Sequence, residues 1–105
     1  MIYSVDFASG SHTGTGAVPI WTVPSDATYV VRDVVILHND TVSHRLDMYV
    51  EAGARTSHIV SEPAVVGKQT LHWDGRQVLN SGDVLTLLTD CPTIVYYRVS
   101  GYRLV

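Results

Sequence analysis

The stretch that decides the fold runs from Thr28 to His38 and reads TYVVRDVVILH. Both sets of alternating side chains in it are apolar: Tyr29, Val31, Val35 and Leu37 on one face, and Val30, Val34 and Ile36 on the other. A strand with two apolar faces is covered on both sides, so we predict the central strand of a sheet. Arg32 and Asp33 interrupt the two faces once each, and since neighbouring strand residues point to opposite sides, they cannot simply pair with each other.

Short strand-like segments separated by turn residues continue from this stretch in both directions. Residues 45–51 (RLDMYVE) alternate between polar and apolar side chains, which is typical of a half-buried antiparallel strand. Pro19 confines the segment 18–23 to a sheet edge or a strand start. The other segments that we predict as strands are 2–7, 57–62, 68–73, 76–79, 84–89, 93–99 and 102–105.

Glycine marks the predicted connections. Residues 8–16 (ASGSHTGTG) are small, polar and glycine-rich, and they predict a flexible Gly/Ser/Thr loop or arm. Asp74-Gly75 is the commonest tight-hairpin dipeptide, because both residues accept positive φ. Ser100-Gly101 is expected to bulge or kink the last strand. Together these features predict an all-β fold: one jelly-roll-like antiparallel β-sandwich of eight to ten short strands over residues 1–105.

The composition agrees with a sheet and excludes several classes of protein. The 105 residues include 17 valines and 10 threonines, against six alanines, two glutamates and one lysine. This balance argues against a helical bundle, a coiled coil, a disordered tail and a βαβ nucleotide-binding fold. The net charge of −3 supplies no basic patch, so we predict no nucleic-acid partner, and no apolar run is long enough for a membrane span.

The residues that could carry chemistry are scattered along the sequence. The five histidines are His12, His38, His44, His58 and His72, and no two stand at the HxH, HxxH or HExxH spacing of a local metal site. The single cysteine, Cys91, has no basic neighbour in the sequence, and is interpreted as a structural or semi-exposed thiol and not as a nucleophile. We therefore predict no catalytic residue, no cofactor and no metal ligand. A cupin-like metal enzyme stays as a disfavoured alternative, since a sandwich can bring distant histidines together.

Aromatic side chains are the most promising feature for binding. The predicted subunit contacts are Trp21, Trp73, Tyr97 and Tyr102. The shortage of lysine and glutamate points the same way, because obligate interfaces are depleted in both residues. The alternative use of such aromatics is a carbohydrate-binding module for host-surface glycans.

Three sequence pieces resemble a known group of proteins. Val23 to Asp33, Gly75 to Leu85 and Ser100 to Leu104 are similar to a turn-and-strand, a G-x-x-VL-x-x-GD-x-L piece and a terminal SGY-x-L piece of small β-sandwich virion proteins of tailed bacteriophages. The resemblance implies a non-enzymatic minor tail, tail-tip or capsid decoration protein, assembled in the bacterial cytoplasm into the virion. It also implies a homo-oligomer, such as a trimer, bound to other virion proteins. The GD-x-L piece is similar to a cupin as well, but the cupin HxH…E metal motif is missing.

Overall fold

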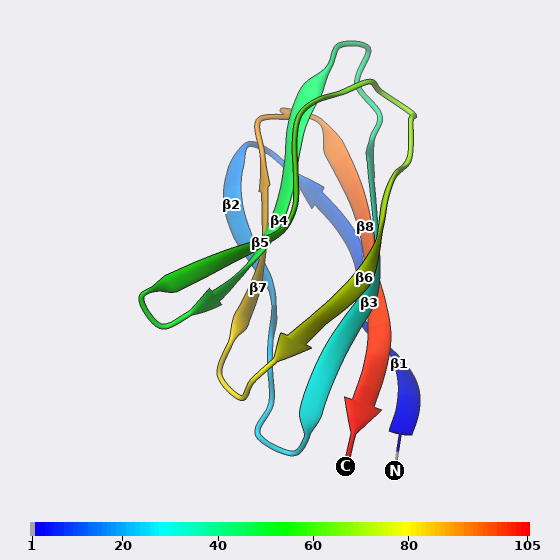
Figure 1. Ribbon diagram of the computed structural model, residues 1–105. Helices are drawn as coiled ribbons and strands as arrows, with labels where there is room; N and C mark the ends of the chain where they lie inside the picture. The colour runs from blue at the N-terminus through cyan, green and yellow to red at the C-terminus, as the bar shows by residue number, and fades with distance from the viewer. Residues whose placement is uncertain (1) are drawn as a thin grey trace.

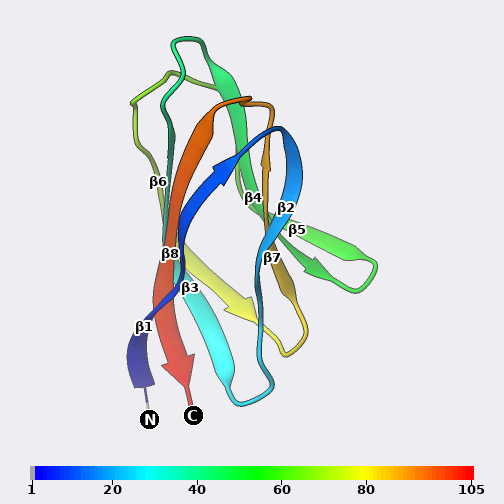
Figure 2. The same cartoon turned by 180° about the vertical axis from the view of Figure 1, so that it is seen from behind.

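Eight β-strands, arranged as two four-stranded antiparallel sheets, make up the computed structural model, which describes residues 2–105 (Figures 1 and 2). The strands are β1 (Ile2–Thr13), β2 (Gly16–Thr22), β3 (Thr28–His38), β4 (His44–Ala52), β5 (Arg55–Val65), β6 (Leu71–Leu79), β7 (Val84–Thr89) and β8 (Ile94–Leu104). One sheet has the order β1-β8-β3-β6 and the other the order β2-β7-β4-β5. The predicted all-β antiparallel sandwich is confirmed, at the lower end of the predicted strand count. Residues 2–105 contain no helix that is long and apolar enough to cross a membrane.

The strand pairing shows how the chain is rolled up. β1 pairs with β8, β2 with β7, β3 with β6 and β4 with β5. The chain is therefore one long double strand, with Ile2 opposite Leu104 at its open end and Ala52 opposite Arg55 beside its tip. Successive parts of this double strand fall alternately into the two sheets, which is the jelly-roll arrangement. The tip of the double strand, at the end of β4 and the start of β5, projects sideways from the body (Figure 1).

β3 is a central strand, as predicted, between β8 and β6. Its side chains do not alternate strictly, because the pairing with both neighbours shifts between Val31 and Asp33. This bulge at Arg32 changes which residues face inward: Val31 and Val34 are both buried in the core, although strict alternation would place them on opposite faces. The predicted grouping of Val31 with Val35 is therefore wrong.

The predicted flexible loop over residues 8–16 is also wrong. Residues 8–13 continue β1 and pair with β8, so the turn is reduced to residues 14–15. The small residues suit a sheet edge that runs beside a large ring: a Cβ on Gly10 would lie 3.4 Å from the hydroxyl oxygen of Tyr97. Small polar residues thus look like a loop in sequence but pair with β8 in the fold.

Asp74-Gly75 is not a hairpin turn but part of β6. The register of β3 with β6 shifts here, since Val31 pairs with Gln77 whereas Asp33 pairs with Asp74. The dipeptide therefore lies at a β-bulge, and neither of its residues adopts the positive φ that a tight hairpin turn would require.

The core lies between the two sheets. The largest fully buried side chains are Ile36, Leu46, Met48, Leu79, Leu85, Leu87, His38, Val31, Val34, Val95, Val99 and Thr89. At one end of the sandwich the connections β1–β2, β3–β4, β5–β6 and β7–β8 gather, and the chain ends lie at the other (Figures 1 and 2). We call the first of these the loop end.

Candidate functional site

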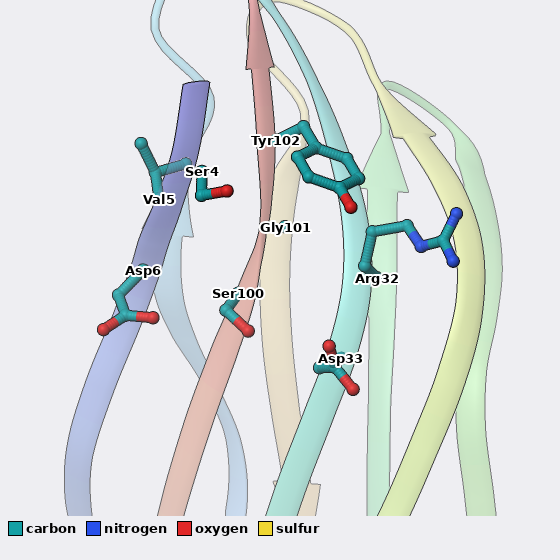
Figure 3. Close-up of a pocket in the computed structure, with 8 residues that line it drawn as sticks. All are labelled: Ser4, Val5, Asp6, Arg32, Asp33, Ser100, Gly101 and Tyr102. Carbon is teal, nitrogen blue, oxygen red and sulfur yellow. The ribbon is translucent and has the colours of Figure 1, made fainter. Parts of the chain in front are cut away.

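A polar depression marks the outer face of the β1-β8-β3-β6 sheet, near the chain ends. Its volume is about 350 Å³. Ser4, Val5, Asp6, Arg32, Asp33, Ser100, Gly101 and Tyr102 line it (Figure 3). We call this feature the outer depression.

Two bulges shape the outer depression. The register of β8 shifts against β1 between Asp6 and Ala8, and against β3 between Val31 and Asp33. The first shift falls between Val99 and Ser100 on β8 and the second between Ser100 and Gly101, so the sheet bends at this level. Gly101 is required here, because a Cβ would collide with the carbonyl oxygen of Val30. The predicted irregularity at Ser100-Gly101 thus exists, with the extra residues on the two neighbouring strands.

Most charges around the outer depression are already paired. Arg98 donates to Asp6 at 3.3 Å, and a His72 ring nitrogen lies 3.1 Å from Asp33. The guanidinium of Arg32 lies 5.9 Å from the centre of the Tyr102 ring. Hydroxyls, carboxylates and one aromatic ring are groups that bind polar ligands such as sugars. They do not include a nucleophile held by a base.

A second charged group lies at the end that carries the termini. The Tyr29 hydroxyl donates to Asp26 at 2.9 Å, and Arg103 donates to the other carboxylate oxygen at 3.1 Å. The Tyr29 hydrogen bond, helped by the Arg103 charge, lowers the pKa of Asp26. Burial and the same carboxylate raise the pKa of Tyr29. This group joins the β2–β3 turn to the end of β8.

A third group lies at the loop end and consists of Asp40, His44, Asp90 and Cys91; we call it the loop-end cluster. The Nε2 atom of His44 lies 2.6 Å from a carboxylate oxygen of Asp40, and its Nδ1 atom lies 3.1 Å from a carboxylate oxygen of Asp90. The hydrogen bond to Asp40 raises the pKa of His44 and lowers that of Asp40. The backbone N–H of Arg45 and the His44 ring lower the pKa of Asp90. One oxygen of Asp40, one ring nitrogen of His44 and the sulfur of Cys91 all lie within 4.8 Å of one another.

Sequence reasoning missed the loop-end cluster. Its members come from the β3–β4 loop, the start of β4 and the β7–β8 loop, and only the fold brings them together. The sole local signal was the i, i+4 spacing of Asp40 and His44, which carries no meaning outside a helix. Among residues 2–105, the one group of three or more side chains that could hold a metal ion consists of Asp40, His44 and Cys91 of the loop-end cluster. The three-histidine site of a cupin-like enzyme does not occur among these residues.

The four predicted contact residues are not gathered into one patch. Trp21 on β2 stacks on Phe7 at 5.0 Å and packs edge-on against Tyr29 at 5.1 Å. Trp73 on β6 and Tyr97 on β8 are also half-buried and pack against the core. Tyr102 is exposed and borders the outer depression. Of the four, Tyr102 is the best placed for a partner, and the contact role of all four stays a prediction.

No protein-family model matches this chain, and no curated protein matches it in sequence. Solved structures do share its fold. A chain of the T13 particle of infectious bursal disease virus superposes over 99% of this chain, with a TM-score of 0.71 and 7% identity. A pentameric capsid protein isolated from metagenomic phage sequences superposes over 93%, with a TM-score of 0.53 and 15% identity.

These similarities concern the fold. This chain spans 31% of the particle chain and 61% of the phage capsid chain, so it matches a part of each. One is a chain of a viral particle and the other a phage capsid protein, and what this chain shares with them is the jelly-roll fold. The expected tail or decoration role is a finer assignment than this likeness carries.

Proposed function

We propose that the chain is a non-enzymatic structural subunit of a bacteriophage virion, which acts by assembling with copies of itself and with other virion proteins. The observation that carries the proposal is the jelly-roll likeness to viral particle chains, one of them a phage capsid protein described as pentameric. Its location in the virion, as capsid subunit, capsid decoration or minor tail protein, is part of the same proposal.

The edges of the two sheets suggest how copies would meet. β2 and β5 are the edges of one sheet, and they carry Pro19 and Pro63, which block strand addition. β1 is an edge of the other sheet, has 12 residues and no proline, and carries one charged side chain, Asp6. A long edge with few charged side chains is a template for pairing with another chain. We therefore assign β1 as the main assembly edge.

Exposed apolar side chains support the same proposal. They lie at both ends of the sandwich and on the outer side of β8: Ile2, Tyr3, Val42, Val66, Val78, Tyr96, Tyr102 and Val105. Contacts with partners would remove this surface from water. A stable interface needs about 800 Å² from each partner, which is a modest share of the 5690 Å² surface of this chain.

Native mass spectrometry of the purified protein, combined with light scattering over a range of concentrations, tests assembly. The expected result is a closed homo-oligomer whose stoichiometry, trimer or pentamer, the masses give directly. Mass spectrometry of purified particles then asks whether the protein is a virion component. A monomer at high concentration that is also absent from particles would refute the proposal.

A carbohydrate-binding module for host-surface glycans is the second candidate function, and the outer depression favours it. Its hydroxyls and carboxylates could bind sugar hydroxyls, and the Tyr102 ring could stack on a sugar face. Binding on a glycan array that Tyr102→Ala abolishes and Tyr96→Ala preserves would support this role. An array without any bound glycan would exclude it for the sugars present.

A further inference from the structure

We propose that Asp40, His44 and Cys91 of the loop-end cluster form a binding site for a zinc-type divalent ion. The three donor atoms, a carboxylate oxygen of Asp40, a ring nitrogen of His44 and the thiol sulfur of Cys91, lie within 4.8 Å of one another. Imidazole and thiolate together select zinc or a similar transition metal over calcium or magnesium. Neither the fold likeness nor the proposed assembly role requires such a site.

Each of the three ligands has a neighbour that would hold it for a metal. His44 has its Nδ1 3.1 Å from Asp90, whose oxygen also accepts the backbone N–H of Arg45 at 2.8 Å. A carboxylate on the far nitrogen of a histidine fixes the ring and leaves Nε2 for the metal, the arrangement found around most metal-bound histidines. The structure thus contains the outer partner as well as the inner ligand.

The other two ligands are held in the same way. Oδ1 of Asp40 accepts a hydrogen bond from the backbone N–H of Thr41 at 2.7 Å. This bond fixes the carboxylate with its other oxygen, Oδ2, facing His44. The sulfur of Cys91 lies 3.2 Å from the hydroxyl of Thr93, a donor that would stabilise a thiolate. Each of the three ligands thus has its own hydrogen-bond partner outside the site, whereas a simple ion pair between Asp40 and His44 would require none of these partners.

His38 shapes the site without being a ligand. Its Nδ1 accepts the backbone N–H of Asp40 at 3.1 Å, and its Nε2 faces the carbonyl oxygen of Val65. Both ring nitrogens are therefore in use, and the ring packs edge-on against His44 at 5.1 Å. His38 thereby positions the β3–β4 loop that carries Asp40.

Metal binding needs small movements of the ligands, because the three donor atoms are spread over as much as 4.8 Å. Ligand atoms of a tetrahedral zinc lie about 3.4–3.6 Å apart, given metal–ligand bonds of about 2.0–2.3 Å. Asp40 and His44 are now 2.6 Å apart and share a proton, so the ion would displace this proton and separate them by roughly 1 Å. Cys91 would lose its own proton, as metal-bound thiols do. Asp40 lies on a surface loop with 20% of its side chain exposed, so it can move and can admit the ion. A water would complete four-fold coordination.

The ion would join the loop end across the two sheets. Asp40 follows β3 in one sheet, whereas His44 opens β4 and Cys91 follows β7 in the other. A bond network through one metal would thus tie both layers together and stabilise the folded protein, with no catalytic step implied.

Cobalt is a direct probe of the site, because a cobalt–thiolate bond gives a near-ultraviolet charge-transfer band. We expect EDTA-treated full-length protein to develop this band up to one equivalent of Co²⁺, and Zn²⁺ to remove it and raise the melting temperature. Asp90→Asn should weaken metal affinity about 10–100-fold without removing a ligand. His44→Gln and Cys91→Ser should abolish the band, and His58→Gln should leave it unchanged.

Asp40→Asn tests a ligand with little risk of unfolding the protein, because the side chain of Asp40 is partly exposed. The melting temperature of this variant without metal, compared with that of the wild type, shows whether the variant is folded. A folded Asp40→Asn protein with undiminished zinc affinity would overturn the assignment of Asp40. The absence of a cobalt band in the wild type, together with a melting temperature insensitive to Zn²⁺, would overturn the site. Neither result would bear on virion assembly.

Discussion

The indole of Trp73 lies over Gly75, two residues further along the same strand: a Cβ on Gly75 would come within 2.7 Å of Cζ2 of the indole. Side chains at i and i+2 of a strand share a face, so the missing side chain at Gly75 makes room for the large ring before it. The ring in turn covers part of the core.

Gly75→Ala should therefore destabilise the protein by about 1–3 kcal/mol, the usual cost of overpacking. Urea denaturation measures it. In a Trp73→Leu background the same change should cost much less, because the indole that collides with the new methyl group is gone. An equal cost in both backgrounds would show that the strand conformation at Gly75, and not the ring, is what requires glycine.

Arg45→Ala should destabilise the fold more than removal of a surface charge. Arg45 donates to Asp47 at 2.7 Å, and Asp47 is fully buried with its other carboxylate oxygen lacking any partner. Without Arg45 the whole buried carboxylate is unpaired, which costs about 1–3 kcal/mol. Arg98→Ala is the matched control, because Arg98 and Asp6 form an exposed pair that contributes about 0–1 kcal/mol. Equal urea midpoints for the two variants would contradict this account.

The pH dependence of stability should reveal the Asp26–Tyr29 contact. The folded-state pKa of Asp26 lies below its ordinary value of 3.8, so its contribution is fully present above that value and is lost as pH falls through the lowered pKa. Asp26→Asn should therefore have a lower melting temperature than the wild type at pH 7, and the difference should shrink below about pH 4. A difference that stays constant down to pH 2 would mean that the charge of Asp26 plays no part.

β1 should be the edge through which copies assemble. Ser9 and Ser11 are exposed residues on this strand, and a lysine at either position would guard the edge as natural proteins do. Ser11→Lys should lower the oligomer fraction in native mass spectra while the melting temperature of the separated subunit stays unchanged. Ser57→Lys, on the projecting tip of β5, is the control and should assemble normally.

The sequence predicts the sheet content well and the site poorly, for one physical reason. Alternation along Leu46, Met48 and Val50 is a local property, and it predicts the burial of these three side chains correctly, but it places Asp47 outward although that side chain is fully buried. Bulges and register depend on the partner strand, which is why the predicted faces of β3 and the predicted hairpin at Asp74-Gly75 are wrong. The loop-end cluster joins residues as far apart as Asp40 and Cys91, and only the fold-back of the double strand brings these together.

The projecting tip of β4 and β5 should open before the rest of the fold. Residues 51–58 are all exposed although most belong to strands, so few buried contacts hold them. Hydrogen exchange should be faster there than in β3, whose residues Val31, Val34 and Ile36 are at most 1% exposed. Trypsin should accordingly cut first after Arg55, and the remaining sandwich should keep its sheets, because the cut lies at the tip of the double strand and not within it. Since β1 and not this tip is the proposed assembly edge, cleavage after Arg55 should be equally fast in the oligomer. Protection of Arg55 on assembly would place the interface at the tip and count against β1.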